Sequence, residues 1–211
     1  MSQLDLFGDT ESNGTDGTVK EGLNILENGE IIFHPSFFPR HESDSLFDNL
    51  RNHIAWRQES MNMYGRNVNF PRLTAWYGDN DKPYSFSGIT LNPLDWTDEL
   101  LAIKERIEAG SDIRYNSVLL NLYRDGNDSI SWHTDGEKEL GRNPVIASVN
   151  FGATRRFQLR HMRTGQKLEM DLLHGSLLIM QGELQHYWQH QVPKSKKVVG
   201  QRINLTFRVI K

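Results

Sequence analysis

The sequence predicts an α+β protein whose C-terminal half is a β-sandwich or barrel. Two amphipathic helical patterns lie in the first half of the 211 residues, and short β-rich runs separated by Gly, Asn and Asp follow residue 114. Helices early and many short strands late are typical of this class. A hydrophobic fraction of 37% is enough for one well-packed core at this length.

The first 28 residues are predicted to form a flexible acidic tail ahead of one folded domain, residues 29–211. Residues 1–30 carry seven acids and one base, and the stretch TESNGTDGTVKEG is polar and Gly-rich without periodicity. The rest of the chain holds 23 bases and 20 acids, so the domain is mildly basic. No apolar run approaches the ~18 residues that span a bilayer. With an acidic start and no cysteine, we expect a cytoplasmic protein.

Two helices are predicted, at residues 41–54 and 97–109. Apolar residues recur at helical spacing, namely Leu46, Phe47, Leu50 and Ile54 in the first and Leu100, Ile103 and Ile107 in the second. Thr97 is suited to be the N-cap of the second helix, and Gly110 follows its last turn.

Two of the predicted strands have faces of different character. In NSVLLNLY, Asn121 and Tyr123 alternate with the apolar residues Val118, Leu120 and Leu122. In QRINLTFRVI, one face carries Arg202, Asn204, Thr206 and Arg208, and the other carries Ile203, Leu205, Phe207 and Val209. The polar face predicts either an outer strand facing water, the commoner case for a strand taken alone, or the wall of a polar cavity.

The stretch SISWHTDGEKE holds a histidine and an aspartate two positions apart, His133 and Asp135. On a strand, residues i and i+2 point the same way, so one metal ion could meet both side chains. The motif alone is weak because it is short. Without cysteines, any metal in this protein must be held by nitrogen and oxygen.

Four stretches in this order, NSVLLNLYRDGNDSISWHTDGEKEL, PVIASVNFGATRRFQLRH, HGSLLIMQGELQHYWQHQVP and QRINLTFRVI, resemble the AlkB family of iron(II)- and 2-oxoglutarate-dependent dioxygenases. The resemblance covers about residues 30–211. FPRLTAWYGD followed by YSFSGITLNP is most similar to the branch that repairs alkylated bases in duplex DNA. It implies a double-stranded β-helix (jelly-roll) core at about 114–211, N-terminal helices, and a substrate-binding lid at about 56–92.

The resemblance also implies an iron(II) site made of His133, Asp135 and a later histidine, with open positions for 2-oxoglutarate and O2. LQHYWQHQVP offers His186 and His190, and the family pattern selects His190. His174 is interpreted as structural. The implied 2-oxoglutarate residues are Asn121, Tyr123, Arg202, Asn204 and Arg208. Arg202 and Arg208 lie ~20 Å apart along an ideal strand, so both reach one small dicarboxylate only if their side chains lean together.

The implied reaction is DNA repair by oxidative demethylation of 1-methyladenine and 3-methylcytosine, with release of succinate and formaldehyde. Both bases are cationic, and Glu137 matches the acidic residue that contacts them. Phe86, with the ring of His133, would sandwich the extruded base, with Tyr84 and Ser87 beside it. Phe86 could instead be a core residue. Tyr64, at a hairpin tip predicted in MNMYGRN, would fill the gap in the duplex. The alternatives are the same chemistry on RNA or a protein side chain, or a non-catalytic jelly-roll binding module.

Two basic clusters and one terminal peptide suggest macromolecular partners. The clusters are Arg155, Arg156 and Arg160 (with Arg163) and Lys194, Lys196 and Lys197. They predict either solvated faces or a track for DNA phosphates. The opening Gln3-Leu4-Asp5-Leu6-Phe7 resembles the short peptide by which bacterial repair proteins dock on the sliding clamp. The alternative is that these residues pack on the chain's own domain or bind nothing.

Overall fold

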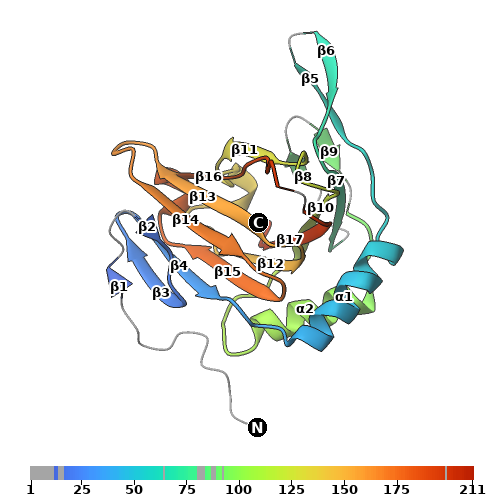
Figure 1. Cartoon of the computed structure of the whole chain (residues 1–211), viewed down its shortest axis with the longest axis horizontal. Coiled ribbons are helices and arrows are strands. Elements are labelled where there is room, and N and C mark those ends of the chain that lie inside the picture. The colour runs from blue at the N-terminus through green and yellow to red at the C-terminus, as the bar shows by residue number, and fades with distance from the viewer. Residues whose placement is uncertain are drawn as a thin grey trace.

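The computed structural model describes residues 12–13, 17–63, 65–79, 84–86, 89–91, 93–197 and 199–211. Its core consists of two β-sheets that face each other, as the predicted jelly roll requires (Figure 1). The larger sheet has the order β1-β3-β4-β15-β12-β17-β10-β7, and the smaller has the order β11-β16-β13-β14-β2. Neighbouring strands are antiparallel except the edge pairs β1·β3 and β14·β2.

The strands of the larger sheet are β1 Ser12–Asn13, β3 Gly22–Leu26, β4 Gly29–His34, β7 Leu73–Gly78, β10 Ser117–Tyr123, β12 Ile146–Gly152, β15 Ser176–Gln181 and β17 Arg202–Arg208. Those of the smaller sheet are β2 Gly17–Thr18, β11 Ile130–His133, β13 Arg155–His161, β14 Lys167–Leu172 and β16 Trp188–Val192. Two hairpins stand outside the sheets: β5 Ser60–Met63 with β6 Arg66–Asn69, and β8 Tyr84–Phe86 with β9 Ile89–Leu91.

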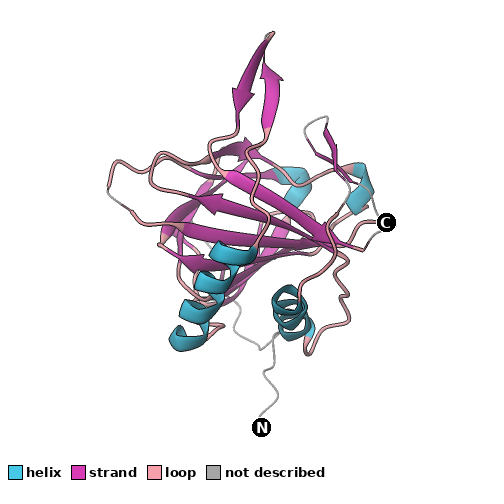
Figure 2. Ribbon diagram, turned by 90° about the vertical axis from the view of Figure 1, so that its right-hand side faces the viewer, coloured by secondary structure: helices cyan, strands magenta, loops and turns pink. Residues whose placement is uncertain are grey.

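Both predicted helices are confirmed, as α1 Arg40–His53 and α2 Asp98–Glu108, and a short α3, Leu184–Tyr187, precedes β16. The hydroxyl of Thr97 accepts a hydrogen bond from the backbone N–H of Leu100, as an N-cap should. Leu50 of α1 and Ile103 of α2 belong to the same buried cluster as Leu205 of β17. Each such side chain contributes about 1.5–3 kcal/mol by its burial. The two helices therefore cover the face of the larger sheet that points away from the smaller one (Figure 2). Within the described part of the chain, no helix has the length and apolar character needed to cross a bilayer.

The predicted tail over residues 1–28 is wrong for residues 12–13 and 17–28, which belong to the fold. β3 pairs with β4 in a tight hairpin, and Asn28 adopts the left-handed conformation at its turn (φ 59°). Val19 and Leu26 are buried in the core between the sheets. The average polarity of the first 28 residues hid this strand because its apolar residues are few. The clamp-like peptide, residues 3–7, lies outside the described residues.

The β5–β6 hairpin predicted within MNMYGRN is confirmed for its strands, and it projects from the end of the sandwich opposite α1 and α2 (Figures 1 and 2). Tyr64, at its tip, lies outside the described residues, as does Ser87. Tyr84 and Phe86 are placed in β8 by their backbone alone. The roles predicted for these four side chains stay predictions.

Candidate active site

His133, Asp135 and His190 form one cluster, with a ligand atom of each within 4.8 Å of the others. Strand pairing brings them together, because His133 of β11 is the direct partner of His190 on β16. Asp135 follows two residues after His133, and its Oδ1 lies 3.8 Å from His133 Nε2. Two imidazoles and one carboxylate are the ligand set that non-haem iron(II) uses with open positions.

Neighbouring groups orient the three side chains. His133 Nδ1 lies 2.8 Å from the carbonyl oxygen of Ser131, so a proton on Nδ1 is donated there and Nε2 is left for a metal. The backbone N–H of Asp135 donates to Gln185 Oε1 at 2.8 Å. Asp135 Oδ1 and His190 Nδ1 are buried and have no hydrogen-bond partner among the described residues. A buried acceptor such as Asp135 Oδ1 needs a partner, and a metal ion would supply one.

The charge state of the cluster also fits a cation. Burial alone would raise the pKa of Asp135, but Arg208, His190 and His133 hold it well below its usual range, so the carboxylate is ionised. Burial and then the neighbouring His133 lower the pKa of His190 to about 3. His190 is therefore neutral at physiological pH, as a metal ligand must be.

The other two histidines considered as ligands or core residues lie elsewhere. His186 is exposed on α3, with Nε2 2.9 Å from Asn143 Oδ1. His174 Nδ1 accepts a hydrogen bond from the backbone of Gly152, and its Nε2 lies 3.1 Å from Asp44. The geometry thus favours His190 over His186 and gives His174 the structural place expected for it.

A cavity between the sheets adjoins the three ligands. Its polar wall is formed by Asn121, Tyr123, Ser148, Arg202, Asn204, Thr206 and Arg208. All of them are buried, and the alternate residues of β17 point into the core beneath the helices. The polar face of β17 is therefore the wall of a cavity, and its interpretation as an outer strand is wrong. The register of β10 and β17 brings these polar side chains together, because Asn121 pairs with Asn204 and Tyr123 pairs with Arg202.

The two arginines occupy different places in this cavity. Arg208 Nη2 lies 2.9 Å from Asp135 Oδ2 and so belongs to the metal end. Arg202 donates from Nη2 to Asn150 Oδ1 at 2.6 Å, and its guanidinium lies 4.8 Å from the ring centroid of Tyr123. Arg202 Nε and Nη1 are buried without a hydrogen-bond partner among the described residues. These two donors fit a carboxylate, and a dicarboxylate has one carboxylate for each arginine.

A second hollow lies on the other side of His133, between β11 and the β5–β6 hairpin. Its wall includes Met61, Val68, Phe70, Arg72, Trp132 and Glu137. Glu137 Oε2 is buried and has no hydrogen-bond partner in the described part of the protein. Sequence reasoning missed Phe70, Arg72, Trp132 and Gln185; Phe70 and Arg72 stand in the FPR that opens one of the family-like stretches.

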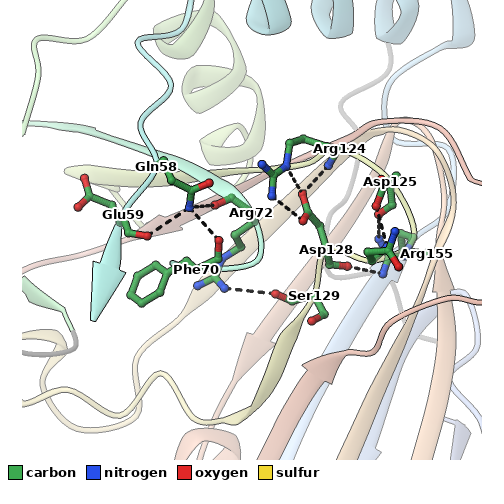
Figure 3. Close-up of polar contacts among 10 residues, drawn as sticks. Gln58, Glu59, Phe70, Arg72, Arg124, Asp125, Asp128, Ser129 and Arg155 are labelled. Carbon is green, nitrogen blue, oxygen red and sulfur yellow. Dashed lines mark hydrogen bonds and ion pairs between the residues drawn. The ribbon is translucent and has the colours of Figure 1, made fainter. Parts of the chain in front are cut away.

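The predicted basic track is corrected at Arg155. Its side chain is buried and donates to the backbone oxygens of Asp125 and Asp128 (Figure 3). It also donates to the backbone oxygen of Pro193, so it holds loops together and does not face DNA. Alternate residues of β13 point to opposite sides, so Arg155 shares the buried side with Phe157 and Leu159, whereas Arg156 lies on the exposed side.

The remaining basic residues are nearer the surface. Arg156 is exposed and ion-paired with Glu169 and Asp171. Arg160 is half-buried over the ring of Trp132, at 4.7 Å from its centroid. The three lysines predicted to contact phosphates, Lys194, Lys196 and Lys197, are exposed.

A jelly roll that holds two histidines and one carboxylate beside an arginine-lined cavity defines the 2-oxoglutarate- and iron(II)-dependent oxygenases. The family model described as the 2OG-Fe(II) oxygenase superfamily matches residues 30–208. The bovine alpha-ketoglutarate-dependent dioxygenase alkB homolog 3 is 42% identical over 205 residues, covering 92% of this chain and 71% of that protein. Human DNA oxidative demethylase ALKBH2 is 37% identical over 209 residues, covering 94% and 80%. The chain therefore belongs to the AlkB family of this superfamily.

Solved structures agree on the fold. OsALKBH1 superposes with a TM-score of 0.56 at 17% identity, covering 90% of this chain and 99% of that one. A 2OG-Fe(II) family oxidoreductase from Burkholderia pseudomallei gives 0.55 at 12% identity, covering 84% of each chain. The predicted enzyme class, an iron(II)/2-oxoglutarate-dependent dioxygenase that uses O2, is confirmed by the family, and the half-buried His133 with the buried Asp135 and His190 fits its metal.

Proposed function

We propose that this enzyme repairs DNA by oxidative demethylation of alkylated bases such as 1-methyladenine and 3-methylcytosine. The main support for this proposal is the hollow beside His133. Its wall includes a buried carboxylate oxygen of Glu137 that has no hydrogen-bond partner among the described residues. An unpaired carboxylate oxygen favours a cationic guest, and these methylated bases carry a positive charge. The relatives named DNA oxidative demethylase support DNA as the substrate.

The residues around the metal cluster and the arginine-lined cavity would bind iron(II) and 2-oxoglutarate. His133, Asp135 and His190 would hold iron(II), which with O2 and 2-oxoglutarate supplies the oxidation of the methyl group. Arg202, with Tyr123 and Asn204, would bind one carboxylate of 2-oxoglutarate. Arg208 and Asn121 would bind the other end of the molecule, which lies beside the metal. This chemistry would place one oxygen atom of O2 in succinate, with loss of carbon dioxide, and the other in the methyl group of the base. The hemiaminal then releases formaldehyde and restores the base.

The extruded base would lie in the hollow in front of His133. Glu137 would accept hydrogen bonds from the exocyclic amine of the base. We propose that Phe86 stacks on it opposite the His133 ring, with Tyr84 and Ser87 alongside, and that Tyr64 fills the gap in the duplex.

An assay with defined oligonucleotides tests the function. Purified enzyme with iron(II) and 2-oxoglutarate is given 1-methyladenine or 3-methylcytosine in single-stranded DNA, duplex DNA or RNA, and succinate, formaldehyde and restored base are measured. We expect base restoration in DNA, and at least tenfold less with Glu137→Gln because a charge-assisted hydrogen bond is lost. Turnover with RNA alone, or with none of these substrates, would overturn the proposal.

We also propose that residues 3–7 tether the enzyme to a sliding clamp. Five positions match the clamp-binding peptide in a segment otherwise poor in apolar residues. Burying Leu6 and Phe7 gains about 1.5–3 kcal/mol each before ordering costs, so a lone peptide binds near micromolar or more weakly. Binding of a purified bacterial clamp should be lost in Leu6→Ala/Phe7→Ala, while demethylation of free oligonucleotides is unchanged. Equal clamp binding by both proteins, or none by either, would end this proposal.

A further inference from the structure

We infer that Arg72 is a positioning residue, which fixes the amide of Asn121 toward the cosubstrate cavity and ties that cavity to the β5–β6 lid. Arg72 lies between β6 and β7 and is 5% exposed. It contributes to the wall of the substrate hollow, whereas Asn121 contributes to the wall of the cosubstrate cavity. Arg72 therefore links the wall of the substrate hollow to a residue in the wall of the cosubstrate cavity.

Hydrogen-bond chemistry sets the orientation of Asn121. Arg72 Nε donates to Asn121 Oδ1 at 2.8 Å. Because a guanidinium can only donate, the amide oxygen must face Arg72, and the NH2 group must take the other side. Asn121 is 4% exposed and stands in the cavity wall next to Tyr123 and Arg202. An amide NH2 held in this way is a donor prepared for an oxygen of 2-oxoglutarate.

The same arginine is held by the base of the lid (Figure 3). Its guanidinium lies 5.2 Å from the ring centroid of Phe70, and Nη1 donates to the carbonyl oxygen of Ser129 at 3.3 Å. Gln58, which precedes β5, donates to the carbonyl oxygens of Phe70 and Arg72 at 2.8 and 3.4 Å. A shift of the hairpin base would therefore move Arg72 and, through it, the Asn121 amide.

If Arg72 were purely structural, its replacement would lower stability without a specific effect on 2-oxoglutarate binding. The nearby Arg124 provides a control for such a structural effect. Arg124 donates to Asp128 in the loop that leads to Ser129 (Figure 3). None of the described hydrogen bonds joins Arg124 to Asn121. Arg124→Gln therefore perturbs the same loop and leaves the Arg72–Asn121 bond in place.

The first experiment contains no nucleic acid and is independent of the proposed function. Binding of 2-oxoglutarate to Mn(II)-loaded protein is measured by calorimetry for the wild type, Arg72→Gln, Arg72→Lys, Arg124→Gln, Asn121→Ala and the double variant Arg72→Gln/Asn121→Ala, with the melting temperature of each. We expect Arg72→Gln to weaken 2-oxoglutarate binding about tenfold, Arg72→Lys to weaken it less, and Arg124→Gln to leave it unchanged. In the Asn121→Ala background, Arg72→Gln should add little, because the two residues act through one bond. Unchanged binding in Arg72→Gln, or fully additive effects, would overturn the inference.

The second experiment tests the link to the lid and rests on the proposed function. The 2-oxoglutarate titration is repeated with a saturating 1-methyladenine oligonucleotide. We expect the oligonucleotide to change 2-oxoglutarate affinity in the wild type and not in Arg72→Gln. If the oligonucleotide binds but the change persists in Arg72→Gln, or is missing from the wild type, the link through Arg72 is wrong. If no oligonucleotide binds, the proposed substrate is wrong and the first experiment still decides the role of Arg72.

Discussion

Arg208 and Asp135 form a buried ion pair in which Nη2 and Oδ2 are 2.9 Å apart and the side chains are 4% and 3% exposed. The pair joins the last strand of the sequence to the carboxylate of the metal cluster. It also accounts in part for the low pKa of Asp135, which burial alone would raise. A direct ion pair therefore joins the carboxylate of the metal cluster to the wall of the arginine-lined cavity.

Removing Arg208 should destabilise the metal-free protein strongly. Arg208→Met leaves the carboxylate of Asp135 buried without its main cation, so we expect the free energy of unfolding to fall by about 3–5 kcal/mol. Urea denaturation with a chelator present measures this. The control is Arg156→Met, which removes an exposed arginine paired with Glu169 and Asp171 and should cost at most about 1 kcal/mol. Similar losses in the two variants would contradict the prediction.

Acid should destabilise the metal-free protein through His190. Burial and His133 lower its pKa from 6.5 to about 3, so below pH 6.5 the unfolded chain binds a proton that the folded chain does not. Stability should therefore fall as the pH decreases from 6.5 toward 3, by at most about 1.4 kcal/mol per pH unit from this group. The depressed pKa of Asp135 affects stability at lower pH. Its contribution to the free energy of unfolding is present above pH 3.8, the ordinary pKa, and is lost as the pH falls toward the pKa of Asp135 in the folded protein.

Unfolding titrations between pH 4.5 and 6.5 separate the contribution of His190 from that of Asp135, because this window lies above the ordinary pKa of an aspartate. His190→Asn should show a shallower dependence of unfolding free energy on pH than the wild type. Parallel curves for the two proteins would mean that His190 does not titrate as described.

Measurements of metal affinity should show whether His190 or His186 is the third metal ligand. His190→Ala removes one of three convergent ligands, and we expect at least a tenfold loss of Mn(II) or Fe(II) affinity. His186→Ala removes an exposed ring that contacts Asn143, so metal affinity should stay at the wild-type level. Calorimetric titration of both variants measures this. A wild-type affinity in His190→Ala with a loss in His186→Ala would reverse the assignment.

The parts of the site that sequence could predict are those that follow from strand alternation. Period two placed Asn121 with Tyr123, and Arg202 with Asn204 and Arg208, and the structure places all five in one wall. Sequence could not tell whether that wall faced water, because this depends on a second sheet packing over it. His133 and Asp135 came from a local motif, whereas His190 needed the family pattern to separate it from His186.

Features that depend on long-range packing stayed hidden in the sequence. Arg155 and Arg156 are adjacent, yet one is buried under three backbone oxygens and the other is exposed. The bond between Arg72 and Asn121 joins residues 49 positions apart. Asp135 and Gln185 are 50 apart. No local pattern marks such contacts, because they arise only when segments far apart in the sequence meet, as β10 meets the loop before β7 and the residues after β11 meet α3.

The lysines that follow Pro193 should contribute to DNA affinity through phosphates. Ser195 N–H donates to the carbonyl oxygen of Gly126 at 2.8 Å, and buried Arg155 donates to the carbonyl oxygen of Pro193, so this segment is anchored close behind the strand that carries His190. Replacing Lys194, Lys196 and Lys197 by Ala should lower the slope of log affinity against log salt by about 0.7 per lost contact on single strands and about 0.9 on duplex. The requirement for 2-oxoglutarate should not change, because these side chains are exposed and outside its cavity.

Fluorescence anisotropy with a labelled oligonucleotide at several salt concentrations measures the slope. A charge-matched control removes Arg40 and Arg51 of α1 and Arg114, which follows α2; all three lie outside the lysine segment, and their loss should leave the slope near the wild-type value. If both triple variants lower the slope equally, the lysines act only through net charge and form no phosphate track.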